Sequence, residues 1–259
     1  MIDIDNMQEG SLSEGLSCLK GIKYIVSDVD DTITSNSRLL STTLSKMEEA
    51  KENGYKIILV SGGSAAWCEV YLRQWPVYKV IAESGALLLY RDSDGQVCYK
   101  DNPNITDKDK EKRKHLLSLI DRKYLSSDQY ARLYDIAVDL KKTPEEELER
   151  IQKLSLSMGA NCAKSSIHLN IWFGSYSKVN GIVSFLSEDG IDTETIKSES
   201  IYLGDSKNDE EAFSFFPLSI GMKSVMDDKE SFSHFPRFIS HFYGGKGFEE
   251  VLSLLVERR

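Results

Sequence analysis

The sequence predicts an α/β fold in which a Rossmann-like doubly wound parallel sheet carries an inserted α+β domain. Three observations support this prediction. Short apolar runs alternate with amphipathic helical segments at the start of the chain, and the same alternation returns near its end. The stretch between them mixes charged helical segments with extended segments. We therefore expect the two outer parts to share one sheet and the middle part to form a separate unit.

The first part of the chain has a βαβαβ pattern. Strands are expected at residues 21–28, 56–61 and 78–82, and helices at residues 41–53 and 64–74. The strands are short continuous apolar runs, which is typical of a parallel sheet that is buried on both faces. Parallel strands joined by helices imply right-handed crossovers.

The pattern resumes in the last third of the chain. Helices are expected at residues 182–186, 209–215 and 248–257, and strands at residues 200–203 and 218–221. These elements have the same alternation as the first part. We therefore expect one sheet assembled from both ends of the chain.

The middle of the chain predicts an α+β unit. A charged helix is expected at residues 107–122, an extended run at residues 132–140, and a second helix after Thr143 and Pro144, with three glutamates in its first turn. The sequence SSIHLNIWF then predicts a strand. The expected domains are core segments at residues 1–88 and 176–259 and an inserted domain at residues 89–175.

The composition excludes several classes of partner. The chain has 41 acidic and 32 basic residues and a formal net charge of -9, which repels nucleic acids and anionic membranes. We therefore expect neither as a partner. The first 15 residues are acidic and have no basic segment followed by an apolar run, and the four cysteines form no CxxC pair. A cytoplasmic location is expected on these grounds.

Three carboxylates follow the first predicted strand, at Asp28, Asp30 and Asp31. Like charges this close raise each other's pKa unless a cation lies between them. Carboxylate ligands without a nearby His or Cys favour Mg²⁺ over zinc. A solvated acidic turn or a helix cap explains the same residues equally well when they are considered alone.

A second acidic group follows a later strand, at Asp205 and Asp209. The carboxyl ends of parallel strands meet at one edge of a sheet, where ligands of this class of fold bind. The two acidic groups together therefore favour one shared metal ion. Capping of the following helix remains a competing interpretation for Asp209.

Candidate phosphate ligands lie at Ser61 and Gly62, at the end of the second strand, and at Lys178, just before a predicted helix. A glycine lets backbone amides approach an anion closely, a hydroxyl adds a donor, and a lysine contributes a positive charge. An ordinary turn and a surface lysine are the competing interpretations.

The order of these motifs resembles that of the haloacid dehalogenase superfamily: DxDxT after the first strand, Ser after the second, a later Lys, and then GDxxND. The resemblance covers the two core segments. It implies that Asp28 is the nucleophile and Asp30 the general acid and base. It further implies that the substrate is bound by Ser61, Gly62, Lys178 and Asn208. The residues that it implies for Mg²⁺ binding are Asp28, Asp30, Asp205 and Asp209.

The insertion resembles the type IIB cap of Cof-like hydrolases and sugar-phosphate phosphatases. In its last strand, alternation places Ile167, Leu169, Ile171 and Phe173 on one face and His168, Asn170 and Trp172 on the other. We expect the first face to lie under the cap helices. The second face is expected to bind the leaving group, with Trp172 stacking on a sugar ring, although simple contact with solvent or core is a competing interpretation.

The resemblance implies a Mg²⁺-dependent phosphatase that hydrolyses a small phosphorylated metabolite, such as a sugar or polyol phosphate, through a phospho-aspartyl intermediate. A phosphomutase of the same superfamily shares that intermediate. A non-enzymatic phospho-acceptor switch of the response-regulator kind uses similar residues, but its lysine comes last, whereas Lys178 precedes Asp205. These two alternatives remain open.

Overall fold

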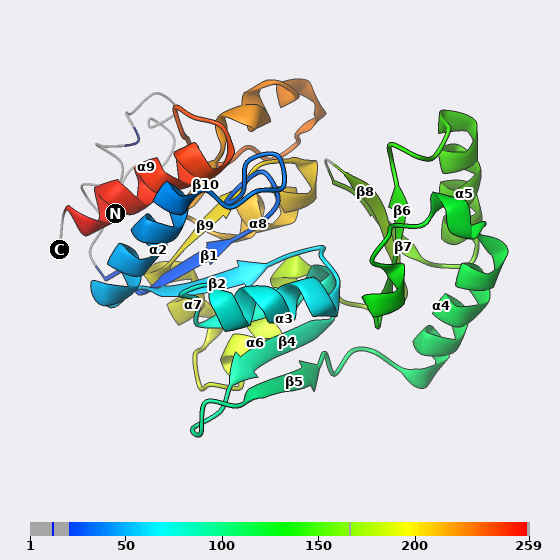
Figure 1. The fold of residues 1–259 in the computed structure, drawn as a ribbon, viewed down its shortest axis with the longest axis horizontal. Helices are drawn as coiled ribbons and strands as arrows, with labels where there is room; N and C mark the ends of the chain where they lie inside the picture. Colours follow the sequence, from blue (N-terminus) through cyan, green and yellow to red (C-terminus); the bar gives the residue numbers. More distant parts are fainter. Residues whose placement is uncertain (1–11, 13–20, 166, 258–259) are drawn as a thin grey trace.

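The computed structural model describes residue 12, residues 21–165 and residues 167–257. Within these residues the strands form two sheets (Figure 1). The larger sheet consists of β1 (Tyr24–Ser27), β2 (Lys56–Val60), β3 (Lys79–Ala82), β4 (Leu87–Arg91), β5 (Val97–Asp101), β9 (Ser200–Gly204), β10 (Ser219–Gly221) and β11 (Phe238–Ile239). Their order in space is β11-β10-β9-β1-β2-β3-β4-β5, so both ends of the chain contribute to one sheet.

Helices cover both faces of this sheet, which confirms the expected doubly wound fold. They are α2 (Ser41–Glu52), α3 (Ala65–Gln74), α6 (Lys178–Ser187), α7 (Thr193–Glu199), α8 (Glu210–Phe215) and α9 (Gly244–Val256). Apolar residues of α2, α3 and α9 share one core with one face of the strands, and those of α6, α7 and α8 share a second core with the opposite face.

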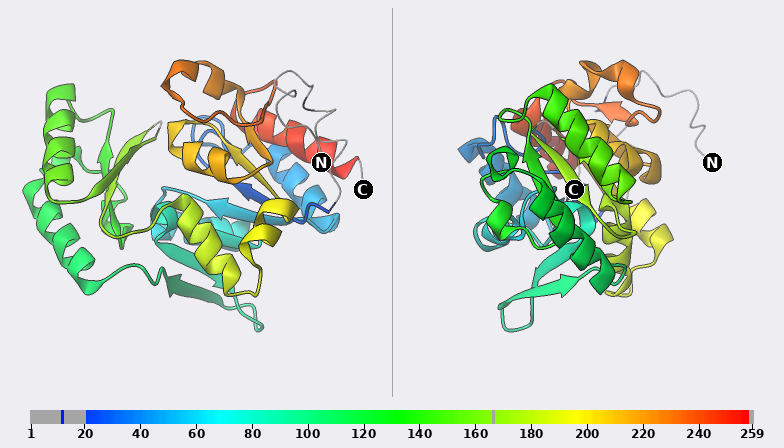
Figure 2. Two further views of the ribbon diagram at one scale, coloured as in Figure 1. Left: turned by 180° about the vertical axis from the view of Figure 1, so that it is seen from behind. Right: turned by 90° about the vertical axis from the view of Figure 1, so that its right-hand side faces the viewer.

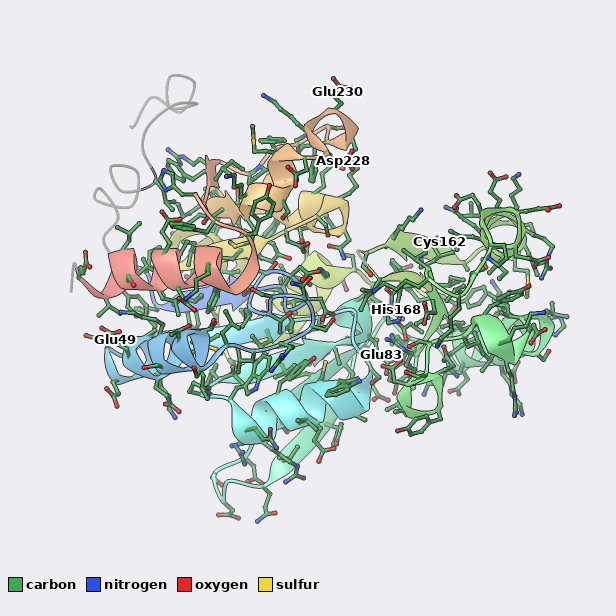
Figure 3. All side chains as sticks on the ribbon, turned by 45° about the horizontal axis from the view of Figure 1, so that its top comes forward. Glu49, Glu83, Cys162, His168, Asp228 and Glu230 are labelled. Carbon is green, nitrogen blue, oxygen red and sulfur yellow. The ribbon has the colours of Figure 1, made fainter. Side chains whose placement is uncertain are left out.

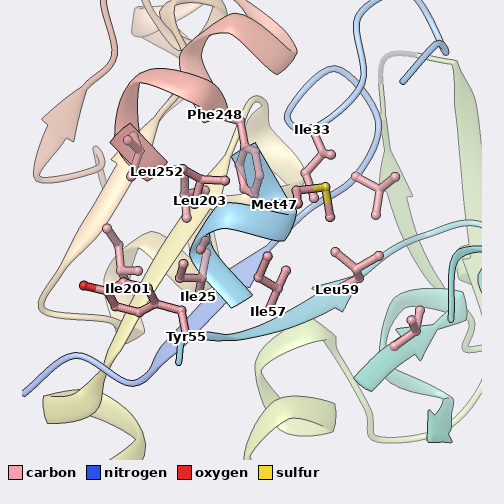
Figure 4. Packing of buried hydrophobic residues seen from close by; sticks show 14 of the residues in the cluster. Ile25, Ile33, Met47, Tyr55, Ile57, Leu59, Ile201, Leu203, Phe248 and Leu252 are labelled. Atoms are coloured by element: carbon pink, nitrogen blue, oxygen red, sulfur yellow. The ribbon is translucent and has the colours of Figure 1, made fainter. Parts of the chain in front are cut away.

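The strands alternate their side chains between these two cores. In β1, Ile25 belongs to the core under α2 and α9, and Val26 belongs to the opposite core. Figure 4 shows the first of these cores, where Met47 of α2 and Phe248 of α9 lie over the strands. Because each such side chain contributes about 1.5–3 kcal/mol when fully buried, the central strands are the most strongly held part of the molecule.

The smaller sheet has the antiparallel order β6-β8-β7, formed by β6 (Asp135–Asp139), β7 (Asn161–Lys164) and β8 (His168–Trp172). Two helices, α4 (Asp107–Leu119) and α5 (Glu145–Ser157), cover it through a separate apolar core. Figure 2 shows this unit, which we call the cap, beside the edge of the large sheet. Short 3-10 helices complete the fold: η2 (Glu83–Gly85), η3 (Arg122–Tyr124), η4 (Gln129–Ala131), η5 (Lys207–Asp209), η6 (Lys223–Met226) and η7 (Lys229–Ser231).

The sheet topology changes the expected start of the insertion. Strands β4 and β5 pair antiparallel with β3 and with each other, so they belong to the large sheet although they lie mostly beyond residue 88. We propose that the cap begins near residue 102. The β4–β5 hairpin was not expected in the large sheet because its second strand, β5, is partly exposed and has no strong apolar pattern.

Other elements were absent from the sequence-based expectation. These are α7, the edge strand β7 and the two-residue strand β11, all of which are short. Short elements have weak periodicity, and pairing with neighbours rather than local pattern defines them. None of the described helices is long and apolar enough to cross a membrane.

Candidate active site

The two acidic strand ends lie side by side at the carboxyl edge of the large sheet. Strand β1 pairs parallel with β9, with Ser27 opposite Leu203, so the residues that follow each strand emerge together. The amide of Asp28 donates to the Leu203 carbonyl at 2.9 Å. Carboxylate oxygens of Asp28, Asp205 and Asp209 lie within 4.8 Å of one another, and all three residues are buried.

Lys178 lies at the centre of this group. Its Nζ is 2.6 Å from Asp28 Oδ1, 2.7 Å from Asp209 Oδ1 and 3.3 Å from Asn208 Oδ1. Burial alone would lower the pKa of Lys178, but the carboxylates of Asp209 and Asp28 raise it above its ordinary value. The lysine is therefore a fixed positive charge in a buried site rather than the surface lysine of the competing interpretation.

Asp209 is held by donors on every side. Its Oδ1 also accepts from the Tyr202 hydroxyl at 2.6 Å, and its Oδ2 accepts from the amides of Asp205 and Ser206 at 3.0 and 3.3 Å. It thereby caps the helical turn that begins at Ser206, as one interpretation of the sequence expected. Both carboxylate oxygens are occupied by protein donors, so Asp209 is best suited to orienting Lys178 and the Asp205 loop.

The charges of the site fit a divalent cation. Three buried carboxylates face one lysine, which leaves an excess of negative charge. Burial raises the pKa of Asp28 to about 7, and burial together with Asp28 raises that of Asp205 well above its usual range. A hard cation bound by oxygen donors would remove this cost, and the donor set contains no His or Cys that would favour zinc.

Asp30 is not part of that carboxylate group, and like Asp28 and Asp205 it lines the adjoining cavity. The geometry of the described residues therefore does not group the Asp30 carboxylate with the other predicted metal ligands. Burial and the neighbouring Asp31 raise the pKa of Asp30. A carboxyl group that holds a proton more readily than usual is suited to general acid chemistry.

The loop after β2 is tied to the cap. Ser61 Oγ accepts from the Gly63 amide at 2.9 Å, which closes a tight turn. The Gly62 carbonyl accepts from Arg132 Nη1 at 2.9 Å and from Asn170 Nδ2 at 3.1 Å, and both of these residues belong to the cap. The predicted phosphate loop is thus part of the contact between core and cap.

A buried glutamate, Glu83, makes the second contact between core and cap. Its carboxylate accepts from the amides of Leu133, Tyr134 and Asp135 at 2.6–3.0 Å and from Ala65 of the core at 3.2 Å. Burial, followed by the Asp135 carboxylate, raises the pKa of Glu83 to about 7, although the three cap amides lower it. Figure 3 shows Glu83 where the two parts of the molecule meet.

Arg132 completes this contact from the cap side. Its guanidinium binds both oxygens of Asp135 at 2.9–3.0 Å and reaches Asp128 at 3.3 Å. Glu83, Arg132 and Asp135 were not among the functional residues predicted from the sequence. The available signal was the Glu83-Ser84-Gly85 turn at the end of a buried strand, which indicated a loop at the functional edge of the sheet but no partner for its carboxylate.

The cap strand β8 presents its predicted residues in three different ways. His168 lines the cavity, and burial followed by Arg132 lowers its pKa. Asn170 is buried, and its amide also donates to Asp135 at 2.8 Å. The expectation that Trp172 stacks on a sugar is wrong: its ring is buried against Tyr176 and Ala86, and its N–H donates to the Tyr176 carbonyl at 3.0 Å.

The opposite face of β8 follows the prediction with one exception. Leu169, Ile171 and Phe173 lie in the cap core under α4 and α5, as expected. Ile167 lines the cavity instead. It precedes the first residue of the strand, where strand alternation no longer fixes the direction of the side chain.

A cavity of about 410 Å³ opens beside Asp28 between core and cap. The core contributes the acidic loops, Gly62, Gly63 and one side of α3, and the cap contributes polar residues that include Ser126, Asp128 and His168. Lys178 and Ser61 are buried behind this surface. The predicted nucleophile therefore faces a space large enough for a small organic molecule.

The haloacid dehalogenase-like hydrolase family model matches residues 25–104. Among solved structures, the Thermoplasma acidophilum protein 0175 has a TM-score of 0.69 and 18% identity, with 91% of this chain and 100% of that chain covered. The phosphatase BT1666 of Bacteroides thetaiotaomicron has a TM-score of 0.63 and 17% identity, with 91% and 96% covered. The subclass IIB sugar phosphatase BT4131 has a TM-score of 0.57 and 16% identity, with 84% and 93% covered.

Comparison with curated protein sequences gave no match. The family model matches the first part of the large sheet, and the fold is similar to that of haloacid dehalogenase-like structures, as the order of the motifs suggested. The solved structures of similar fold include a putative HAD/Cof-like hydrolase of Plasmodium vivax and the subclass IIB sugar phosphatase BT4131. At these levels of sequence identity the structural similarity defines the fold only. The substrate has to be inferred from the residues of the site.

Proposed function

We propose that this chain is a Mg²⁺-dependent phosphatase that hydrolyses a small phosphorylated metabolite, a sugar or polyol phosphate, through a phospho-aspartyl intermediate on Asp28. The observation that carries the proposal is the position of the Asp28 carboxylate. It is buried, it lies 2.6 Å from a charged lysine, and it lines a cavity of substrate size. These are the properties of an oriented nucleophile rather than of a structural acid.

The first step is attack of an Asp28 carboxylate oxygen on phosphorus, which forms an acyl phosphate and breaks the bond to the leaving oxygen. Asp30 donates a proton to that oxygen, in accord with its raised pKa. In the second step water attacks phosphorus, Asp30 takes up the water proton, and the Asp28 carboxylate is released with inorganic phosphate. Asp30 thus has the same protonation state at the beginning and the end of each turnover.

Lys178, Ser61 and the amides of the Gly62 loop are proposed to stabilise charge on the transferring phosphoryl oxygens. Asn208, which contacts Lys178, helps to orient the lysine. Asp28 and Asp205 would hold Mg²⁺, with Asp209 fixing the surrounding loop. The bound ion would neutralise charge on the phosphoryl group and would allow Asp28 to remain ionised at neutral pH.

The cavity also bears on the two alternatives. A phospho-acceptor switch has no need of a space of about 410 Å³ formed jointly by core and cap, so the cavity favours a small-molecule substrate. A phosphomutase would use the same intermediate and the same residues. Product analysis separates it from a phosphatase, because a mutase releases a rearranged phosphate ester and no inorganic phosphate.

The test is a phosphate-release assay over phosphorylated metabolites with Mg²⁺ or with EDTA. We expect activity with Mg²⁺ that EDTA removes, and a loss on the order of 10³-fold or more in Asp28→Asn, because a carboxamide is not a competent nucleophile. Asp107→Asn is the matched control: its carboxylate is exposed on the cap helix α4, away from the buried carboxylate group, and we expect activity within a few-fold of wild type. Equal activity in Asp28→Asn, or activity that is independent of metal, would rule out the proposed mechanism.

A further inference from the structure

One wall of the cavity comes from the core helix α3 and the residue that follows it, and most of its side chains are aromatic or apolar. Trp67, Val70, Tyr71, Gln74 and Trp75 line it. Their spacing of three, four, seven and eight residues places them on one side of the helix. The side of α3 that faces the sheet is a different one, formed by Ala65, Cys68 and Leu72.

The exposed part of this wall has no role in the folding core. Trp67 is 53% exposed and Val70 is 38% exposed. The Trp67 ring is stacked on Tyr71 at a centroid distance of 6.3 Å, and Tyr71 is stacked on Trp75 at 4.3 Å. Exposed aromatic rings that are held in a fixed orientation beside a cavity are typical of surfaces that bind the flat face of a ligand.

The opposite wall of the cavity is polar and comes from the cap. It includes the hydroxyl-bearing residues Ser126, Ser127 and Ser165 and the carboxylates of Asp128 and Asp139, together with His168. Burial and Arg132 lower the pKa of His168, so the ring is neutral near pH 7 and both accepts and donates hydrogen bonds. This wall is suited to hydroxyl groups.

The charges of the cavity disfavour a second anionic group on the substrate. Among its described lining residues the one cation is Arg132, which is buried and bound to Asp135 and Asp128. Asp128 and Asp139 lie on the same side. A carboxylate or second phosphate on the leaving group would lie near these carboxylates and would have no unpaired cation to bind. Burying such an unpaired charge costs free energy, which would weaken binding.

We propose that Trp67 is a specificity-determining residue that stacks on the leaving group, and that this group is an uncharged, hydroxyl-bearing ring whose phosphate is its only anion. The inference rests on the proposed phosphatase function and adds to it a stacking surface on the core rather than on the cap. An aromatic wall facing a hydroxyl-binding wall matches a ring that has one apolar face and polar edges.

The first test compares glucose 6-phosphate and mannose 6-phosphate with the open-chain ester glycerol 3-phosphate. We expect Trp67→Ala to lower kcat/KM for the better hexose phosphate about 10-fold, mainly through KM, and to leave glycerol 3-phosphate within about two-fold. Trp67→Phe retains a flat ring and should restore most of the loss. Phe242→Ala is the matched control, since Phe242 is also 53% exposed but lies outside the cavity lining.

The second test concerns charge. We expect 6-phosphogluconate, an open-chain acid, and glucose 1,6-bisphosphate to be hydrolysed at least about 10-fold less efficiently than glucose 6-phosphate. Equal losses for ring and open-chain substrates in Trp67→Ala, or a preference for either substrate that carries a second anionic group, would overturn the inference. Hydrolysis of glycerol 3-phosphate without hydrolysis of either hexose phosphate would also overturn it while leaving the phosphatase function intact, and absence of all Mg²⁺-dependent release would contradict the phosphatase function.

Discussion

Single residues in this site carry buried charges, which are stable only because an oppositely charged residue lies beside them. Lys178 is buried and touches both Asp28 and Asp209. Removing one partner of such a buried group typically costs about 3–5 kcal/mol, because the remaining charges lose their compensation. The same arrangement fixes the nucleophile in one position. Stability and catalytic orientation are therefore coupled at the level of one side chain.

His168 gives a prediction for the pH dependence of stability. Its pKa in the folded protein is lowered below 6.5 by burial and by Arg132, so the unfolded chain takes up the proton first as the pH falls. The stability contribution is present above pH 6.5 and is lost as the pH falls through the folded pKa. We expect the free energy of unfolding of wild type to fall more between pH 7.5 and pH 5.5 than that of His168→Gln.

Urea unfolding at several pH values measures this difference. His115→Gln is the control, since His115 is exposed on α4 and should leave the pH dependence of wild type unchanged. Parallel pH profiles for wild type and His168→Gln would show that the folded protein does not disfavour the charged imidazole.

At the scale of elements, the start of α6 is fixed by its contact with the η2 turn. Gly85 has φ of +109°, and a Cβ at this position would lie 2.1 Å from the Ser177 carbonyl oxygen. Gly181 of α6 also lies close to Gly85, since a Cβ at Gly181 would be 2.7 Å from the Gly85 Cα. This close approach of two backbones positions Lys178, which lies between Ser177 and Gly181.

We therefore expect Gly85→Ala to destabilise the protein by more than about 3 kcal/mol and to reduce phosphate release strongly, because α6 must move and Lys178 with it. Thermal unfolding and the phosphate assay measure the two effects. Gly190→Ala is the matched control: Gly190 also has positive φ, at +78°, but has open space around it, and we expect a cost near 1 kcal/mol with unchanged activity. Equal losses of stability in both variants would mean that the η2 contact is dispensable.

At the scale of the whole molecule, buried polar groups link the cap to the core. Glu83 binds three consecutive cap amides, and Arg132 and Asn170 bind the Gly62 carbonyl. The position of the cap and the conformation of the phosphate loop are therefore linked. Displacement of the cap would break hydrogen bonds at both places.

Glu83→Gln tests this linkage. A carboxamide retains one acceptor oxygen but turns N–H groups toward two buried amide donors, so we expect a loss of about 3 kcal/mol at pH 8, above the Glu83 pKa of about 7. Hydrogen exchange of the Tyr134 and Asp135 amides should become faster in this variant. Glu49→Gln on the exposed side of α2 should change neither property. Unaltered exchange in Glu83→Gln would contradict the role of Glu83 in holding the cap.

The sequence alone determined the order of the core elements and the composition of the site. Apolar strands that alternate with helices predicted a parallel sheet with function at its carboxyl edge, because strand–helix–strand connections join parallel strands through right-handed crossovers. The candidates Asp28, Asp205, Asp209 and Lys178 followed from that order, and they lie together in the structure. Local chemistry and short-range periodicity were sufficient for these inferences.

The tertiary structure alone decided which side chains meet across the junction of core and cap. No local signal identifies the partners of Glu83 and Arg132, since these partners are distant in sequence and depend on how the cap is oriented. The same orientation buries Trp172 and encloses the cavity that Trp67 of the core helix lines. Contacts between elements depend on long-range packing, which strand and helix periodicity does not encode.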